Sequence, residues 1–335
     1  MVTKTAPKKE VAPPSARATT ARGKVYNDIF ETIGGTPLVR AKKFIAKYKL
    51  EADVLAKLEF FNPLGSIKDR TALAMVEAAE QAGHISPGKT TIIEASSGNM
   101  AISLAFVAAT KGYKLIIVLP ESVSLERRKF LLFYGAELVL TAAEKGMKGA
   151  NEIAASLMKQ TQDAWTPDQF HNASGPVAHA EGTAEEIWAD TGGKVDVLIC
   201  GVGTGATITG IAHVLKEKKK DFKAFAVEPA ESPVLSGGDP GQHKIQGIGV
   251  GFKPPLLNKS AVDGVIQVPG QQALEMAREV SRLEGIPCGI SSGANFAAAL
   301  HAAQLPENKG KTIVVMVPSF AERYIASELF QRLEN

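Results

Sequence analysis

The sequence predicts an α/β protein of two domains, each built on a mostly parallel, twisted sheet covered by helices. Short apolar runs at 114–119, 195–200 and 312–317 have the composition of buried strands, and helical patterns alternate with them. The 335 residues are enough for about two hydrophobic cores. Because ligands of such sheets bind beyond the carboxyl ends of the strands, we expect the site in the cleft between the domains.

The elements of the first half follow from apolar periodicity and turn residues. Ordered structure is expected from Val25. A Gly-Gly-Thr-Pro turn at 34–37 precedes Leu38 and Val39. Ser124 is a favourable helix N-cap residue, and Gly135 is a typical helix end. Strands are expected at 53–59, 90–94, 114–119 and 137–140, and helices at 71–82, 100–111 and 124–134.

In the second half, the strand at 195–200 runs directly into a glycine-rich turn and then into a helix that reaches Lys219. Further strands are expected at 223–228, 263–268 and 312–317, and helices at 271–284, 293–303 and 322–333. We expect residues 25–62 together with 172–335 to form a larger domain, and residues 63–171 to form a smaller, mobile domain.

Charge and composition exclude several classes of protein. Six of the 38 basic residues lie within residues 1–25, so the rest of the chain has a net charge of −2 and no basic stripe for nucleic acid. We expect residues 1–24 to be a disordered basic tail, whose prolines disfavour the amphipathic helix of a transit peptide. No apolar stretch is long enough to span a membrane. Cys200 and Cys288 lack metal-ligand spacing, so we expect buried thiols, no metal site and a cytoplasmic location.

A lysine is placed at the start of a predicted helix by the turn-forming run 61–70. Lys68 lies near the positive end of the helix dipole, which disfavours an ammonium group and lowers its pKa. A lysine of this kind suits Schiff-base chemistry. The alternative, when the run is taken alone, is a solvated surface charge.

The loop at 203–207 follows a strand and opens a helix, so its backbone amides and the helix dipole can hold an anion. Ile208 stands where a dinucleotide-binding fingerprint has its third glycine, and the Gly-Lys-Ser/Thr ending of a nucleotide-binding P-loop is missing. The hydroxyls of Thr204 and Thr207 instead suit a terminal monophosphate. A small-residue turn that only permits close packing is the alternative.

The run Ser96-Ser97-Gly98-Asn99 has the same placement after a strand and before a helix, with donors that suit a carboxylate. A plain N-cap turn remains the alternative. A third junction of this kind, at 289–294, contains Ser291. A lysine, a monophosphate site and a carboxylate site together indicate pyridoxal 5′-phosphate chemistry on an amino acid.

Residues 25–333 also resemble the cysteine synthase (O-acetylserine sulfhydrylase) group of the β-family, or fold-type II, pyridoxal-phosphate enzymes. The matching stretches occur in the family order: I-G-G-T-P-L-V-R, F-N-P-L-G-S-I-K-D-R, S-S-G-N, S-L-E-R-R-K, G-V-G-T-G-A-T-I-T-G, V-E-P-A-E-S-P-V-L-S-G-G, H-K-I-Q-G-I-G, G-I-S-S-G-A and P-S-F-A-E-R-Y.

The resemblance implies a role for each matched residue. Lys68 would be the Schiff-base lysine, Asn99 would bind the 3′ oxygen of the cofactor, and Ser291 would face its pyridine nitrogen. The phosphate would be held by Gly203, Thr204, Gly205, Ala206 and Thr207 of the larger domain. The substrate would be bound by Ser96, Ser97, Gly98, Met100 and Gln169, with Gly247 in the loop that closes over it.

The implied activity is that of a transferase in cysteine biosynthesis, in which sulfide replaces the acetoxy group of O-acetyl-L-serine to give L-cysteine and acetate. Binding of the substrate carboxylate is expected to draw the smaller domain shut. The resemblance further implies a homodimer and a possible complex with the C-terminal tail of serine acetyltransferase. A catalytically weakened homologue that retains only this regulatory role is one alternative.

The sequence departs from the family pattern at three places. Met100 replaces a hydroxyl residue and is also found in the β-cyanoalanine synthases of the family, which makes cyanide acting on cysteine an alternative reaction. Ala206 replaces a glycine, at a cost of about 1 kcal/mol if that position has positive φ. His171, His179 and Glu181 lie in a divergent segment, and we interpret them as surface variation.

Overall fold

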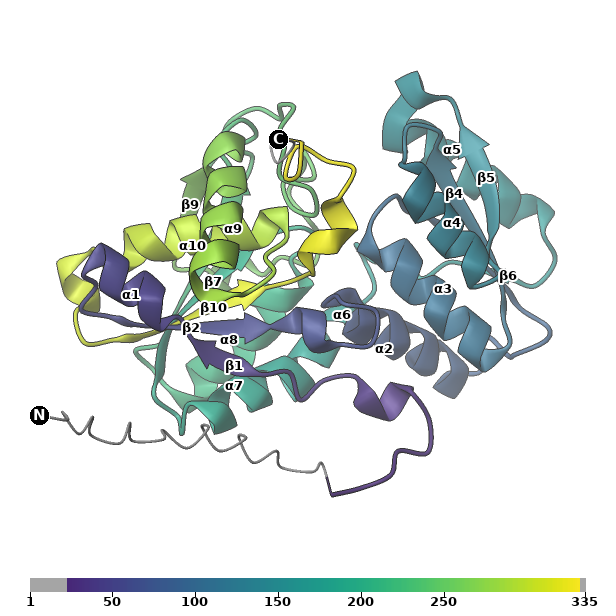
Figure 1. The fold of residues 1–335 in the computed structure, drawn as a ribbon. Coiled ribbons are helices and arrows are strands. Elements are labelled where there is room, and N and C mark those ends of the chain that lie inside the picture. Colours follow the sequence, from purple (N-terminus) through teal and green to yellow (C-terminus); the bar gives the residue numbers. More distant parts are fainter. Residues whose placement is uncertain (1–22, 332–335) are drawn as a thin grey trace, which may run out of the picture.

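The computed structural model describes residues 23–331, so the predicted tail at 1–24 lies almost wholly outside the described residues. A six-stranded sheet with the order β1-β2-β10-β7-β8-β9 forms the base of the larger lobe (Figure 1). All neighbouring strands are parallel except β1 and β2. The strands are β1 (Leu38–Arg40), β2 (Asp53–Leu58), β7 (Val195–Gly201), β8 (Lys223–Pro229), β9 (Gly264–Val268) and β10 (Thr312–Val317).

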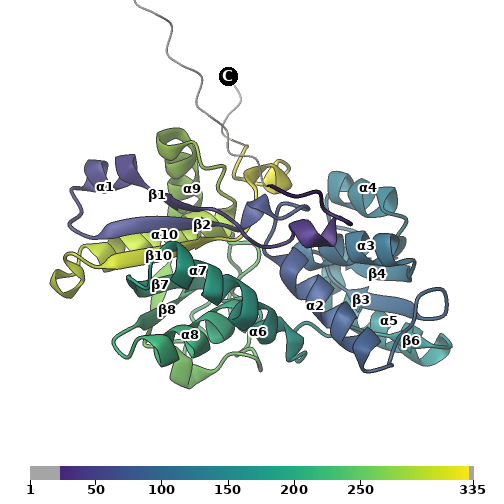
Figure 2. The same ribbon diagram turned by 90° about the horizontal axis from the view of Figure 1, so that it is seen from below.

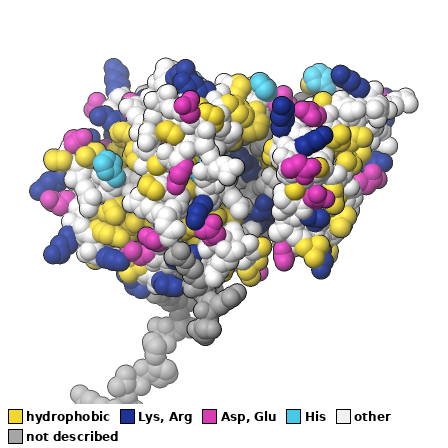
Figure 3. Space-filling model, turned by 90° about the horizontal axis from the view of Figure 1, so that it is seen from above, with side chains coloured by type: hydrophobic (Ala, Val, Ile, Leu, Met, Phe, Trp, Pro, Cys, Tyr) yellow, Lys and Arg dark blue, Asp and Glu magenta, His cyan; other side chains and the backbone are white. Residues whose placement is uncertain are grey.

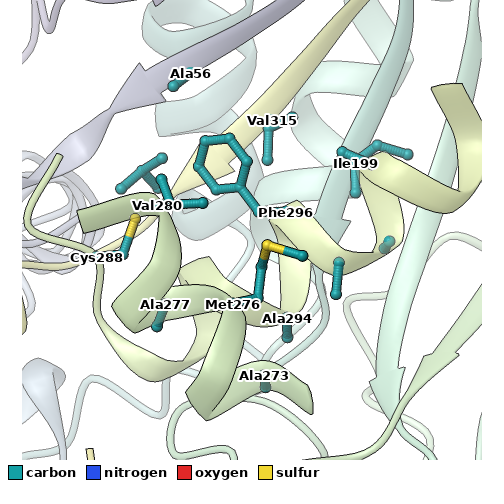
Figure 4. Close-up of a cluster of buried hydrophobic side chains, with 14 of the residues drawn as sticks. Ala56, Ile199, Ala273, Met276, Ala277, Val280, Cys288, Ala294, Phe296 and Val315 are labelled. Carbon is teal, nitrogen blue, oxygen red and sulfur yellow. The ribbon is translucent and has the colours of Figure 1, made fainter. Parts of the chain in front are cut away.

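Helices cover both faces of this sheet, as expected for nearly continuous apolar strands. One face carries α1 (Lys42–Tyr48), α9 (Gly270–Glu284) and α10 (Ile290–Ala303). At its centre Phe296 is fully buried among aliphatic side chains, including Val280 and Val315 (Figure 4), and it meets Phe44 edge to face at 5.3 Å. The other face carries a π-helix (His179–Ala184), α7 (Glu185–Asp190) and α8 (Ala206–Lys218), and α6 (Ser174–Ala178) packs against α8.

A second sheet forms the base of the smaller lobe, with the order β5-β4-β3-β6 and all strands parallel. Its strands are β3 (Thr91–Ala95), β4 (Lys114–Pro120), β5 (Glu137–Thr141) and β6 (Ala164–Trp165). One face packs on α2 (Lys68–Gln81), α3 (Asn99–Lys111) and α4 (Leu125–Phe133), and the other on α5 (Gly146–Gln160) (Figures 1 and 2). No helix in residues 23–331 has the length and apolar character needed to cross a bilayer.

A buried ion network fixes the start of α2 against the larger lobe. The Arg70 guanidinium donates to the carboxylates of Glu59 and Glu186, both at 2.7 Å. Glu186 also accepts from the backbone amide of Gly35 at 2.9 Å, and Thr36 donates to Glu59 at 2.7 Å. Because Lys68 lies two residues before Arg70, this network holds the lysine in place between the two sheets.

The predicted α/β architecture is confirmed, and most predicted elements lie within three residues of those observed. The helix predicted at 322–333 is wrong: the chain makes a short 3-10 turn, Ala321–Tyr324, and then further turns. Side chains bind the carbonyl groups that a helix would use. Arg278 donates to the carbonyl of Leu329 at 2.8 Å, and the Ser327 hydroxyl donates to that of Tyr324 at 2.6 Å. The last predicted residues, 332 and 333, lie outside the described range.

Short 3-10 turns complete the described elements. They are η1 (Phe30–Thr32), η2 (Glu59–Phe61), η3 (Ala143–Lys145), η5 (Lys259–Ala261) and η6 (Pro306–Asn308). The first of them packs on the smaller lobe, where the Phe30 ring meets Phe106 at 5.3 Å.

Candidate active site

A cavity of about 370 Å³ lies where the two lobes meet, at the carboxyl ends of β3, β7 and β10. Figure 3 shows the surface hollowed between the lobes. This is the position at which open α/β sheets bind ligands. The site residues predicted from the sequence line the cavity with one exception, Ala206: they are Lys68, Ser96, Ser97, Gly98, Asn99, Met100, Gln169, Gly203, Thr204, Gly205, Thr207, Gly247 and Ser291.

Lys68 is the first residue of α2, and its side chain lies in the cavity. Burial lowers the pKa of its amine to about 8, against a smaller opposite effect from Cys200. Within residues 23–331, no carboxylate contributes to the pKa shift of this amine. A sizeable fraction of the amine is therefore neutral near physiological pH, the form that can accept a proton or attack a carbonyl carbon.

The loop after β7 forms a close-fitting concave surface of backbone groups. Gly205 has φ +84°, and a Cβ there would lie 2.9 Å from the backbone nitrogen of Leu257. A Cβ on Gly203 would lie 2.5 Å from the carbonyl oxygen of Gly247. Ala206 is the first residue of α8 and has negative φ, so alanine causes no backbone strain there. Thr204 and Thr207 contribute hydroxyl groups to the same part of the cavity.

The segment between β3 and α3 faces this loop across the cavity. Ser96 is buried, and the Arg127 guanidinium donates to the carbonyl of Ser97 at 2.6 Å. The amide oxygen of Asn99 is buried without a hydrogen-bond partner within residues 23–331, and its amide nitrogen makes only a 3.4 Å contact with the Tyr324 hydroxyl. An unsatisfied buried amide at a cavity wall indicates that Asn99 is available to a ligand.

Met100 reaches two environments. Its side chain is buried in the apolar cluster of the smaller lobe and also lines the cavity. This position therefore offers the cavity no side-chain hydroxyl. Its position within α3 is compatible with the buried, apolar character of that helix.

Several lining residues were not predicted from the sequence. Tyr324 and Ser319 hydrogen-bond to each other at 2.8 Å and lie beside Asn99, and the stretch P-S-F-A-E-R-Y that carries them was the available signal. Phe170 and Phe252 come from distant segments, and their rings meet at 5.2 Å. Cys200 also lines the cavity, and burial raises the pKa of its thiol to about 12. Both cysteines are buried, as predicted.

One interpretation of the divergent segment is wrong. His171 and Glu181 are exposed, as expected of surface variation, but His179 is buried with 1% of its surface exposed. It contacts Thr183 and the cavity residue Thr207. The π-helix that begins at His179 turns this side chain inward against α8.

These groups fit pyridoxal 5′-phosphate. Gly203, Thr204, Gly205 and Thr207 line the cavity at the start of α8, where backbone amides and the helix dipole favour an anion such as a phosphate. The Lys68 amine is buried without a counter-ion in the described chain, and the Asn99 amide oxygen has no partner there. The fold and the site thus define an enzyme that uses this cofactor to transform an amino acid.

The chain belongs to the pyridoxal-phosphate dependent enzyme family, whose model matches residues 29–319. It is 47% identical to the cysteine synthase of Staphylococcus aureus over 92% of this chain and 98% of that protein. The crystal structure of cysteine synthase from Entamoeba histolytica aligns with a TM-score of 0.91 and 42% identity, covering 96% of this chain and 95% of that one. An O-ureido-L-serine synthase aligns with a TM-score of 0.87 and 37% identity, covering 93% and 97%.

A buried carboxyl group two residues before Ser96 makes stability depend on pH. Burial raises the pKa of Glu94 to about 7, and Thr166 donates to this carboxyl at 3.0 Å. The folded state therefore binds the proton more tightly than the unfolded state, so the stability that Glu94 contributes is present below about pH 4.5 and is lost as the pH rises through about 7.

We expect Glu94→Gln to raise the free energy of unfolding at pH 8, by up to about 3 kcal/mol, and to change it little near pH 4.5. Thermal unfolding at the two pH values measures this. Glu137→Gln, at an exposed carboxylate paired with Lys114, is the control. Equal effects of Glu94→Gln at both pH values would contradict the prediction.

Proposed function

We propose that this chain is a cysteine synthase that replaces the acetoxy group of O-acetyl-L-serine with sulfide. The C–O bond to acetate breaks, a C–S bond forms at the β-carbon, and L-cysteine and acetate are released. The observation that carries the proposal is the buried Lys68 amine in one cavity with the glycine-rich loop at 203–207 and the hydroxyl-rich segment at 96–99. The similarity to cysteine synthases along nearly the whole chain supports it.

Each part of the cavity has a proposed task. Residues 203–207 hold the cofactor phosphate, Asn99 binds the 3′ oxygen, and Ser291 faces the ring nitrogen. Ser96, Ser97 and Gln169 receive the substrate carboxylate, with Gly98 and Met100 completing that segment. When bound, pyridoxal phosphate stabilises negative charge at the substrate α-carbon, which permits departure of the β-substituent.

Lys68 handles the proton. Its neutral amine is placed to take the proton from the α-carbon and to return it once sulfur has added, because burial favours the uncharged form before transfer. The smaller domain, residues 63–171, closes when the substrate carboxylate is bound. Closure excludes water, aided by the apolar lining from Phe170 and Phe252, and so protects the reactive species from hydrolysis.

Product analysis with purified, cofactor-loaded protein tests the proposal. O-acetylserine or O-phosphoserine is combined with sulfide or with cyanide, and in a separate reaction cysteine is combined with cyanide. The amino-acid products are then quantified. Cysteine formed from O-acetylserine and sulfide is the expected main product. A loaded enzyme that neither changes its visible absorption with O-acetylserine nor forms cysteine would rule the function out.

β-Cyanoalanine synthesis from cysteine and cyanide is a second candidate, favoured by the thioether of Met100 in the cavity wall. A large preference for O-acetylserine with sulfide over cysteine with cyanide would discard it. A regulatory homologue without turnover is a third candidate, which any appreciable turnover by the wild type would dismiss.

We expect Met100→Thr to raise kcat/KM for O-acetylserine about tenfold, because a hydroxyl at the start of α3 adds a hydrogen bond to the substrate carboxylate. Met100→Val, which changes size without adding a donor, is the matched control. Steady-state rates at varied O-acetylserine measure the effect. Equal rates for the two variants would show that a hydroxyl at this position does not contact the carboxylate.

We further propose that the protein acts in the cytoplasm as a homodimer and that a serine acetyltransferase C-terminal tail enters the same cavity. The similarity to cysteine synthases supports these assignments. Sedimentation velocity measures the oligomeric state. Competition between O-acetylserine and a peptide with the acetyltransferase C-terminal sequence measures the complex, and a peptide that binds without competing would place it outside the cavity.

A further inference from the structure

A buried histidine lies directly behind the phosphate loop and uses both of its ring nitrogens. The Nε2 atom of His179 is 3.2 Å from the hydroxyl of Thr207, and the Nδ1 atom is 2.9 Å from the hydroxyl of Thr183. His179 and Thr183 are fully enclosed, whereas Thr207 lines the cavity. The three side chains form a short hydrogen-bonded chain that leads from the protein interior to the cavity wall.

Close packing between two helical segments brings these groups together. The segment α6 and the π-helix after it lie beside α8 (Figure 2). A Cβ on Gly210 of α8 would lie 2.2 Å from the carbonyl oxygen of Pro176 and 2.9 Å from the Cβ of His179. Because position 210 is a glycine, the two backbones approach closely enough for His179 to reach Thr207, one turn earlier in α8.

The imidazole is neutral in this environment. Burial, together with the positive charges of Arg70 and Lys68, holds the pKa of His179 well below its ordinary value. A neutral imidazole has one N–H donor and one acceptor nitrogen. Two arrangements of the chain are therefore possible, and they differ in whether Thr207 accepts a hydrogen bond from His179 or donates one to it.

A phosphate in the cavity distinguishes these arrangements, because its oxygens accept hydrogen bonds. For Thr207 to donate to the phosphate, its own oxygen must accept from the Nε2–H of His179. The Nδ1 atom then has no proton and must accept from the hydroxyl of Thr183, the one orientation in which all three groups and the phosphate are satisfied. The opposite orientation would turn a lone pair of Thr207 toward an anion.

We propose that His179 is a positioning residue that, with Thr183, holds the Thr207 hydroxyl as a donor to the cofactor phosphate. The inference rests on the proposed role of residues 203–207 in holding that phosphate. It concerns cofactor binding alone, so it can fail while the proposed reaction stands. A histidine that only filled space would affect folding and would have no specific link to Thr207.

A double-mutant cycle on cofactor affinity tests this link. The dissociation constant of pyridoxal 5′-phosphate is measured on apo-protein by absorbance for wild type, His179→Phe, Thr207→Val and the double variant. We expect each single variant to bind about 10- to 100-fold more weakly, and the double variant to bind no more weakly than Thr207→Val. Unchanged affinity of His179→Phe, or effects that multiply in the double variant, would overturn the proposal.

His213→Phe is the matched control, since His213 lies on α8 with Thr207 but its side chain is largely exposed. Its cofactor affinity should equal that of the wild type. Thr183→Val tests the chain without altering the imidazole, should His179→Phe fail to fold. It should weaken binding several-fold, and Thr183→Ser should restore it; equal affinities for Thr183→Val and wild type would count against the proposal.

A spectroscopic readout on the wild type completes the test. Nitrogen-15 NMR of imidazole-labelled apo-protein, titrated with inorganic phosphate and then with pyridoxal 5′-phosphate, reports which ring nitrogen of His179 carries the proton. We expect the Nε2–H tautomer in the cofactor complex, and an Nδ1–H tautomer there would refute the proposed orientation. This signal is independent of turnover.

Discussion

Replacing Lys68 by alanine is expected to lower kcat for cysteine formation by at least about 10³-fold, because in the proposed function one amine both binds the cofactor covalently and moves the α-proton. The fold should persist, since the Arg70 network that anchors the start of α2 is untouched. Single-turnover and steady-state rates with O-acetylserine and sulfide measure the loss. The visible absorption of the cofactor with and without borohydride reports the missing covalent link.

Two variants make this expectation specific. Lys114→Ala removes an exposed amine on β4 that pairs with Glu137, and it should leave kcat unchanged. Lys68→Arg keeps a positive charge but supplies a guanidinium that cannot act as a base near neutral pH, so it should be as inactive as Lys68→Ala. If Lys68→Ala turned over within tenfold of the wild type, the assignment of Lys68 would be wrong.

The second large effect is expected from Gly205→Ala. The new Cβ would lie 2.8 Å from the Cβ of Leu257, and alanine is disfavoured at φ +84°. We expect a loss of about 3 kcal/mol of stability from backbone strain and overpacking together, and cofactor binding weaker by about 100-fold, because relieving the contact would distort residues 203–207, the proposed phosphate site. Equilibrium cofactor titration and thermal unfolding measure the two effects.

The neighbouring position supplies the control. Ala206 begins α8 with ordinary helical geometry, so Ala206→Gly should reduce stability by less than about 1 kcal/mol and leave cofactor affinity nearly unchanged. If Ala206→Gly strengthened cofactor binding, alanine at this position would be strained after all. If Gly205→Ala bound the cofactor normally, the loop would be more adaptable than its contacts indicate.

The parts of the fold that could be predicted from the sequence are those with local causes. Apolar runs such as 312–317 predict buried strands, and glycine or hydroxyl residues at strand-to-helix junctions predict where a ligand meets backbone amides. Lys68 alone was ambiguous, and its position in one cavity with residues 96–99 and 203–207 is what the structure adds. Whether alanine at position 206 reduces stability depends on the φ angle of that residue, which cannot be predicted from composition.

The incorrect expectations have causes distant in the sequence. The segment 322–333 has helix-favouring composition, but Arg278, about 50 residues away, binds its carbonyl groups. His179 lies in a segment without clear periodicity, and its partner Thr207 is 28 residues further on. The local sequence pattern does not predict the position of a side chain when its hydrogen-bond partner is distant in the sequence.

Strand order also has a consequence for the emerging chain on the ribosome. The smaller sheet is encoded by one continuous stretch, from β3 to β6, whereas β2 in the larger sheet pairs with β10, whose residues are among the last to be synthesised. We therefore expect the smaller lobe to gain structure first, while the edge of β2 that pairs with β10 waits for a strand about 260 residues further along the chain. Pulse-labelling hydrogen exchange on stalled nascent chains would show early protection of β3 and β4, and early protection of the β2 amides that bond to β10 would contradict this order.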